Sequence, residues 1–366
     1  MISPRSFLSV MLPLAVLTSG LASAQAPAPS AAPAPAEPTI PRNLDVPGNA
    51  LVASGPAPEI DLLYTGDVIG YIEDCGCHMN PAGGLARRAW LLSQLQANYP
   101  SMPVVLLDSG NFSDNPTEAG DLRTATLLQS MKKLGYKAIN VGERDLTFGY
   151  DDFMKRTEGV GLTFLSTNIV KQGTKDPVFR PYTIVEAKGT SGKPVRIGVL
   201  GIDRYSPVWQ KAGPAGTNLG MAAPADMIAT YLPEVRAKSD VVVLLASIAK
   251  DDAHELAKKF QDIDLIIGAY AGIFSSLDEV EGRVRIYFTG NQGKRIGESR
   301  ITLDANRRVS DITSYLHFLT VRYPTDKAME DAIALVVAKT KAAEPNSKKA
   351  AAATNPENTA PAADAH

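Results

Sequence analysis

A carboxylate, two cysteines and a histidine lie close together early in the chain. Asp67 follows an apolar run, so a strand ending there would present its carboxylate to a metal ion. Ile69 stands two residues later, and its side chain has no donor atom for a metal ion. Cys75, Cys77 and His78 follow shortly afterwards. The segment therefore combines one hard oxygen ligand with several soft ligands.

The cysteine pair allows three interpretations. A disulfide between Cys75 and Cys77, or two buried thiols, would shape the loop, and so small a disulfide ring would be strained and easily reduced. Two thiolates with the imidazole of His78 would instead suit Zn²⁺, or Cu(I) if Met79 joins them. In the third interpretation the pair is redox-active, with a thiolate stabilised by the arginines at 87–88. The sequence leaves all three open.

Polar residues also follow other predicted strands. Asn111, Glu143 and Asp145 lie in such positions, and ligands of α/β sheets bind at strand ends. Together with Asp67 they could form a small oxygen-rich site for one divalent cation such as Ca²⁺ or Mg²⁺. The same groups could instead cap the strand-end loops through hydrogen bonds. Arg144 could hold an anion at this place.

Short apolar runs alternate with helical patterns across the middle of the chain. Strands are predicted at Ile60–Tyr64, Val104–Asp108, Ala138–Val141, Thr163–Ser166, Arg196–Ile202, Val241–Ala246, Leu265–Ile267, Val284–Thr289 and Glu298–Leu303. Helices are predicted at Leu85–Ala97, Asp121–Leu134, Tyr150–Thr157, Pro224–Lys238 and Asp251–Gln261. This alternation indicates layered α/β packing with the strands in the middle.

The two ends of the chain differ from its middle. Arg5, the apolar run after it and the small residues that follow predict a signal peptide over 1–24. Ala and Pro dominate 25–56, which favours an extended linker. The folded domain is predicted over 57–325, and 326–366 is predicted to hold a terminal helix and a disordered tail. The mature chain has no stretch of the roughly 20 apolar residues that a membrane helix needs.

Composition limits the partners of this chain. It has a formal net charge of −2, with 45% hydrophobic and 21% charged residues, which suits a soluble packed domain. A balanced charge gives no reason to expect a nucleic acid polymer as a partner. We therefore expect a small ligand or a protein partner, whose identity the sequence does not indicate.

Several segments, in their order and spacing, resemble the calcineurin-like metallophosphoesterase superfamily, and within it the N-terminal catalytic domain of the 5'-nucleotidase family. The resemblance covers about 57–315 and implies a four-layer α/β/β/α sandwich of two mixed sheets flanked by helices. The cysteine segment would be an insertion of this chain. The resemblance rests on Gly-Gly-Leu-Ala-Arg-Arg at 83–88, Val-Leu-Leu-Asp-Ser-Gly-Asn at 105–111, Leu-Gly-Tyr-Lys-Ala-Ile-Asn-Val-Gly at 134–142, and further matches at 145–149, 197–202 and 262–268.

The resemblance also implies where a pair of metal ions would bind. The family holds two ions with an Asp-x-His pair, a bridging Asp, an Asn and three histidines, and a catalytic His follows the Asn. The first Asp matches Asp67, its His partner Ile69, the bridging Asp Asn111, the Asn Glu143, and the catalytic His Arg144. The later histidines fall on or near positions without an imidazole, namely Ile248, Tyr270 and Gly272.

This loss of ligands shapes the functional hypotheses. The leading one is an exported 5'-nucleotidase-like protein of the bacterial periplasm or cell surface, with a largely lost dimetal site. It would bind a ligand, metal or partner rather than hydrolyse nucleotides. An alternative is an active phosphate-ester hydrolase with an altered site at Asp67, Asn111 and Glu143. A third is a metal-handling or redox accessory protein that uses Cys75, Cys77 and the adjacent histidine, with Cu or Zn as the metal.

Overall fold

The computed structural model describes residues 57–353, except for 78, 148, 205–218 and 276–278. The predicted signal peptide and the predicted linker at 25–56 lie outside the described residues. The chain divides into a unit at 1–37 and a unit at 38–366, and the second unit holds every described residue.

Among the described residues, six strands form a first sheet in the order β14-β13-β1-β2-β3-β4. The first four strands along the chain run parallel to one another, and β13 and β14 add antiparallel pairs at one edge. The strands are β1 (Ile60–Thr65), β2 (Val104–Asp108), β3 (Tyr136–Asn140), β4 (Phe164–Leu165), β13 (Arg295–Leu303) and β14 (Val309–Phe318).

A second sheet, in the part of the chain that the structure describes, has the order β11-β12-β10-β9-β7-β6. Its four central strands are parallel, and β6 and β11 close the edges in antiparallel pairs. The strands are β6 (Tyr182–Lys188), β7 (Pro194–Asp203), β9 (Val241–Ser247), β10 (Leu265–Gly268), β11 (Glu279–Glu281) and β12 (Val284–Phe288), and the short strands β5 (Ile169–Lys171) and β8 (Leu219–Met221) pair separately.

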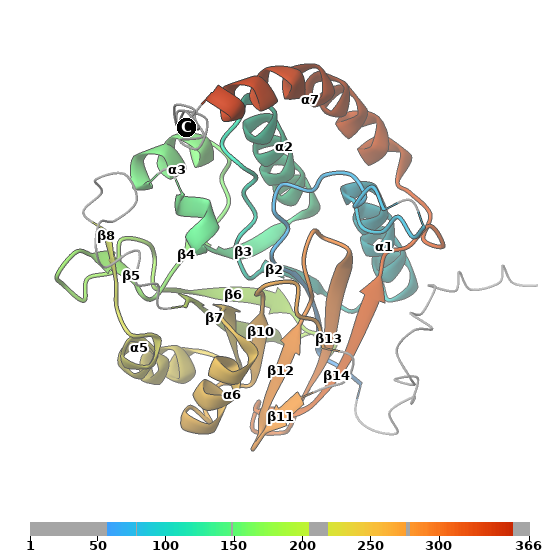
Figure 1. Cartoon of the computed structure of the whole chain (residues 1–366). Coiled ribbons are helices and arrows are strands. Elements are labelled where there is room, and N and C mark those ends of the chain that lie inside the picture. Colours follow the sequence, from blue (N-terminus) through green and yellow to red (C-terminus); the bar gives the residue numbers. More distant parts are fainter. Residues whose placement is uncertain (1–56, 78, 148, 205–218, 276–278, 354–366) are drawn as a thin grey trace, which may run out of the picture. The chain divides into compact units, whose positions relative to one another are not determined.

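Three apolar clusters separate four layers. Alternate residues of β1 and β9, such as Leu62 and Val243, meet between the two sheets, because successive side chains of a strand point to opposite faces. A second cluster packs the other face of the first sheet against helices, and a third packs the second sheet against the remaining helices. This arrangement (Figure 1) confirms the predicted four-layer α/β/β/α sandwich with two mixed sheets.

The helices divide between the two outer faces. The first sheet is covered by α1 (Leu85–Asn98), α2 (Glu118–Leu134), α3 (Tyr150–Thr157) and α7 (Lys327–Ala353), and the second by α5 (Pro224–Lys238) and α6 (Lys250–Lys259). Local signals fix their ends. The side chain of Thr117 accepts a hydrogen bond at the start of α2, and Gly135 ends that helix in a left-handed conformation. Among the described residues, no helix has the length and apolar character needed to cross a membrane.

Helix α7 extends further than the composition of the last segment predicts. A disordered tail is expected from about residue 341, whereas the helix continues to Ala353. Alanine and lysine dominate this stretch, and both are strong helix formers, so a composition without large apolar residues does not exclude a helix. The final residues, 354–366, lie outside the described part of the chain.

Candidate functional site

Asp67 lies in the loop after β1, at the edge of the sheet where the parallel strands end. Its backbone has a φ of 50°, a conformation that L residues adopt rarely, and its side chain is buried. The carboxylate accepts a hydrogen bond of 3.0 Å from Nδ2 of Asn111, and the nearby backbone N–H groups of Ala271 and Gly272 also favour its charged form. Burial raises the pKa of Asp67 above its ordinary value, and these hydrogen bonds offset the rise only in part.

Asn111 follows β2 and uses every hydrogen-bonding atom of its side-chain amide. Its Nδ2 donates to Asp67 and also to Oγ of Ser247 at 2.8 Å. Its Oδ1 accepts from the backbone N–H of Arg144 at 3.0 Å. The amide therefore joins the loops after β1, β2 and β3 to the last residue of β9, and it directs an N–H donor at Asp67.

Asp145 binds the loops after β2 and β3 to each other. It lies in a short 3-10 helix, η1 (Glu143–Leu146), and its buried carboxylate accepts backbone N–H groups of Asn111, Gly142 and Ser113 at 2.8–2.9 Å. Burial raises the pKa of Asp145 to about 6. The carboxylate thus caps two loops and does not point toward Asp67 as a second ligand.

Glu143 and Arg144, at the positions of the family's Asn and catalytic His, have side chains engaged elsewhere. Oε2 of Glu143 forms an ion pair of 2.9 Å with Arg204, whose guanidinium lies 5.5 Å from the ring centre of Tyr270. Nε of Arg144 donates to the carbonyl of Ser113 at 2.7 Å, and its Nη2 donates to the side chain of Asn115 at 2.9 Å. The structure therefore brings the side chains of Asp67 and Asn111 together, whereas those of Glu143 and Arg144 contact other residues.

These donors do not fit a two-metal centre. Such a centre needs carboxylate and imidazole ligands that converge on both ions. Ile69, Ile248 and Gly272 have no side-chain donor, and Asn111 directs N–H hydrogens at Asp67 where a cation would need a lone pair. Within the described residues, no group of three or more His, Cys, Asp or Glu side chains is placed to hold a metal ion.

The cysteines lie on a separate loop, between β1 and α1. The backbone N–H of Cys75 donates to the carbonyl of Ala82 at 2.9 Å, and Asp74 pairs with Gly83 as an isolated bridge. Cys75 is half-buried, Cys77 is exposed, and both are free thiols. His78, predicted as a soft-metal ligand, lies outside the described residues.

Charge and hydrogen bonding make the two thiols unequal. Burial raises the pKa of the Cys75 thiol, but hydrogen bonds from the Cys77 side chain and from backbone groups, with the charge of Lys294, outweigh it and lower that pKa. The hydrogen bond to Cys75 raises the pKa of Cys77. The arginines predicted to stabilise a thiolate have other partners, since Arg87 contacts Asp74 at 3.5 Å and Arg88 is buried and donates to the hydroxyl of Tyr136.

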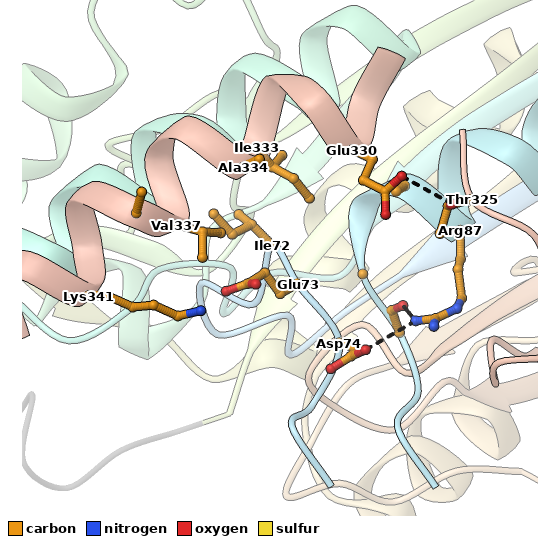
Figure 2. Close-up of a pocket in the computed structure, with 14 residues that line it drawn as sticks. Ile72, Glu73, Asp74, Arg87, Thr325, Glu330, Ile333, Ala334, Val337 and Lys341 are labelled. Carbon is orange, nitrogen blue, oxygen red and sulfur yellow. Dashed lines mark hydrogen bonds and ion pairs between the residues drawn. The ribbon is translucent and has the colours of Figure 1, made fainter. Parts of the chain in front are cut away.

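A cavity of about 470 Å³ lies beside this loop, between the segment at 72–74 and α7. Figure 2 shows Ile333 and Val337 of α7 on one side and Asp74 and Arg87, joined by their ion pair, on the other. The cavity has an apolar side with charged residues around it. The sequence analysis did not predict this cavity. One of its walls is formed by α7, and none of the motifs at 83–88, 105–111 or 134–142 lies in that helix.

Comparisons with known proteins agree with this fold. No family model matches the chain. Over 192 residues, 48% of this chain is 26% identical to 29% of a 2',3'-cyclic-nucleotide 2'-phosphodiesterase/3'-nucleotidase of Salmonella typhimurium. Over 122 residues, 32% of this chain is 30% identical to 21% of a 5'-nucleotidase of Vibrio cholerae. The chain spans less than a third of the length of either relative.

Solved structures support the same fold. A sulfate thiohydrolase SoxB of Thermus thermophilus superposes with a TM-score of 0.68 at 18% identity, over 78% of this chain and 61% of that one. A calcineurin-like phosphoesterase, YfkN of Bacillus subtilis, superposes with a TM-score of 0.65 at 18% identity, over 78% of this chain and 98% of that one. The predicted resemblance to 5'-nucleotidases and calcineurin-like phosphoesterases is thus confirmed.

Proposed function

We propose that this chain, which has the calcineurin-like phosphoesterase fold and a nucleotidase-like sequence, does not hydrolyse phosphate esters and acts by binding a ligand or partner. The observation that carries the proposal is the hydrogen bond from the amide of Asn111 to the carboxylate of Asp67. The backbone N–H groups of Ala271 and Gly272 also lower the pKa of the same carboxylate. At position 111 the carboxylate therefore faces an N–H donor, where a shared metal ion would need a second oxygen ligand.

The energetics of phosphate-ester hydrolysis support this proposal. The uncatalysed reaction is so slow that enzymes supply accelerations of up to about 10²¹-fold. In two-metal enzymes the ions stabilise both the attacking and the leaving oxygen. The side chains of Glu143 and Arg144 are bound to Arg204, Ser113 and Asn115, and they do not supply those charges in place of the ions.

An activity assay with a matched variant tests the proposal. We expect wild type and Asp67→Ala to show the same background rate on aryl phosphate monoesters, aryl phosphate diesters, 2',3'-cyclic nucleotides and nucleoside monophosphates, with Mg²⁺, Mn²⁺, Co²⁺, Zn²⁺ or Ca²⁺. A metal-dependent rate in wild type that disappears in Asp67→Ala, with folding intact by circular dichroism, would overturn it. That outcome would favour a hydrolase with an altered site at Asp67, Asn111 and Glu143.

We also propose that the protein is exported to the bacterial periplasm or cell surface. The support is the pattern of Arg5, an apolar run and small residues that ends at Ala24, followed by the Ala/Pro-rich linker. Amino-terminal sequencing of the protein from its native cells tests this directly. We expect the mature chain to begin at Gln25, and a chain that retains residue 1 would contradict export with cleavage.

A further inference from the structure

Cys75 and Cys77 are neighbouring free thiols, of which Cys75 is half-buried and Cys77 is exposed. Sγ of Cys77 donates to the backbone carbonyl of Cys75 at 3.8 Å, Sγ of Cys75 donates to the carbonyl of Asn80 at 3.9 Å, and only Gly76 separates the two residues. Gly76 has a φ of 64°, and no atom lies within 4 Å of the position that a Cβ would take there. The loop is therefore open at Gly76, next to the exposed Cys77, and its backbone turns as a glycine allows.

The base of the same loop is held in place. Asp74 pairs with Gly83, and the backbone N–H of Gly76 donates to Oδ1 of Asp74 at 3.1 Å. Ala82 pairs with Thr320, next to the strand β14. Backbone pairing fixes the two ends of this loop, and its middle is exposed. Another molecule can therefore reach the thiols without any rearrangement of the fold.

We propose that Cys75 and Cys77 are a thiol–disulfide exchange site for cysteines of another protein. In the forward direction the Cys75 thiolate attacks a sulfur of the partner's disulfide, so that a mixed disulfide forms and one partner thiolate leaves. Cys77 then loses its proton to solvent and attacks Sγ of Cys75. The second partner thiolate leaves, and the Cys75–Cys77 disulfide remains.

The exchange is balanced and reversible. The pair gives up two electrons, and the partner disulfide takes them up to become a dithiol. Cys75 is the first nucleophile because the neighbouring Cys77 and the charge of Lys294 lower its pKa, whereas the pKa of Cys77 is raised. A disulfide across a single residue is strained, and strained, exposed disulfides have the more oxidising potentials. The oxidised form is therefore expected to pass its disulfide to a partner dithiol.

The surroundings of the two thiols bear on which partner they would take. A soft-metal site with closed coordination needs ligands besides two thiolates. The described residues near the pair gather no group of three His, Cys, Asp or Glu side chains, and His78 lies outside them. Met79 is fully exposed, so its thioether is directed at solvent. Small molecules bind in concave sites that bury most of their surface, whereas Cys77 is exposed and no atom lies within 4 Å of a Cβ position at Gly76. An open tip suits the surface of a large partner.

Mass spectrometry with an aromatic disulfide tests the site on the full chain. Reduced wild type is expected to release about two thiolates per chain and to finish two hydrogens lighter, without an adduct. Cys77→Ser is expected to stop at a stable adduct after about one thiolate, whereas Cys75→Ser reacts about tenfold or more slowly. Wild type that carries two adducts and no internal disulfide would overturn the proposal, as would single variants that react at equal rates.

Met79→Ala, which keeps both thiols, is the control and should behave as wild type.

A second arm identifies the partner. The oxidised protein is mixed with either a reduced, unfolded multi-cysteine protein or glutathione at the same thiol concentration. Oxidation of the protein thiols about tenfold faster than that of glutathione supports a protein partner, and equal or faster reaction of glutathione overturns that assignment. None of these measurements depends on phosphoesterase activity.

Discussion

Nδ2 of Asn111 donates to Oδ1 of Asp67 across 3.0 Å and thereby joins the loops after β1 and β2. In the family that this chain resembles, the corresponding pair is two carboxylates that share metal ions. Replacing one carboxylate with a neutral amide removes the repulsion between the two groups and turns one of them into a donor. The loops are therefore held together by hydrogen bonds that need no cation.

Asn111→Asp tests this relationship. The substitution places a second carboxylate against that of Asp67, so we expect it to lower the free energy of unfolding by about 2 kcal/mol at neutral pH. Denaturant titration at pH 7 measures the change. Asn115→Asp is the matched control, because the side chain of Asn115 is exposed beside Arg144, and it should change stability by less than about 0.5 kcal/mol. An Asn111→Asp protein as stable as wild type would contradict the account.

Asp108 predicts a pH dependence of stability. It is buried at the end of β2, accepts from the hydroxyl of Thr65 at 2.5 Å, and has a pKa that burial raises to about 7 from 3.8. Between these values the folded protein holds a proton that the unfolded chain releases, so stability falls as pH rises through this window. Asp108→Asn should remove the contribution of Asp108 to this fall in the free energy of unfolding. Across the whole window that contribution is on the order of 4 kcal/mol at most. Denaturation midpoints from pH 4 to 8 measure it, and an unchanged slope would rule the assignment out.

The ion pairs of His254 predict a second pH dependence of the free energy of unfolding, at higher pH than that of Asp108. Its ring nitrogens lie 2.9 Å from Glu279 and 2.9 Å from Glu281, which joins α6 to β11. Burial alone would lower the pKa of His254, but the two carboxylates outweigh it and raise the pKa. The stabilisation by charged His254 is therefore complete below 6.5, the pKa of this histidine in the unfolded chain. It is lost as pH rises through the raised pKa of His254 in the folded protein. His254→Gln should cost about 1 kcal/mol at pH 6 and almost nothing at pH 9; an equal cost at both would show that the charge is not involved.

Helix α7 predicts a contrast between two neighbouring residues. Ile333 is 7% exposed against the helices that cover the first sheet, whereas Leu335 is 72% exposed. Ile333→Asp should lower the free energy of unfolding by about 3 kcal/mol, and Leu335→Asp by less than about 0.5 kcal/mol. Thermal denaturation of the two variants measures the contrast. Equal effects would mean that α7 does not pack on the domain as described.

The regular elements were the most predictable part of this protein. The predicted bounds of β2, α3 and α5 coincide with those in the structure, because apolar periodicity and a proline at a helix start are local signals. β14 was missed. Its inward-facing Ser314 binds Ser299, and Ser299 also binds the hydroxyl of Tyr64, so buried polar groups interrupt the apolar alternation. Only the partner strand shows that these serines are satisfied.

The candidate site was predictable in its residues and not in its contacts. The motifs bring Asp67, Asn111 and Glu143 to the ends of parallel strands, and the structure places them there. The pairing of Glu143 with Arg204, and the backbone donors at 271 and 272, depend on loops far apart in the sequence. Contacts between distant loops surround Asp67 with hydrogen-bond donors. Residue types and spacing alone do not predict such contacts.

Elemental mass spectrometry tests the central claim most directly. Wild type and Asp67→Ala are purified from the native compartment without chelators, and their metal content per chain is compared. The account predicts that neither protein retains stoichiometric metal through Asp67, so the two contents are the same. About two first-row or alkaline-earth ions per chain in wild type, lost in Asp67→Ala, would contradict it.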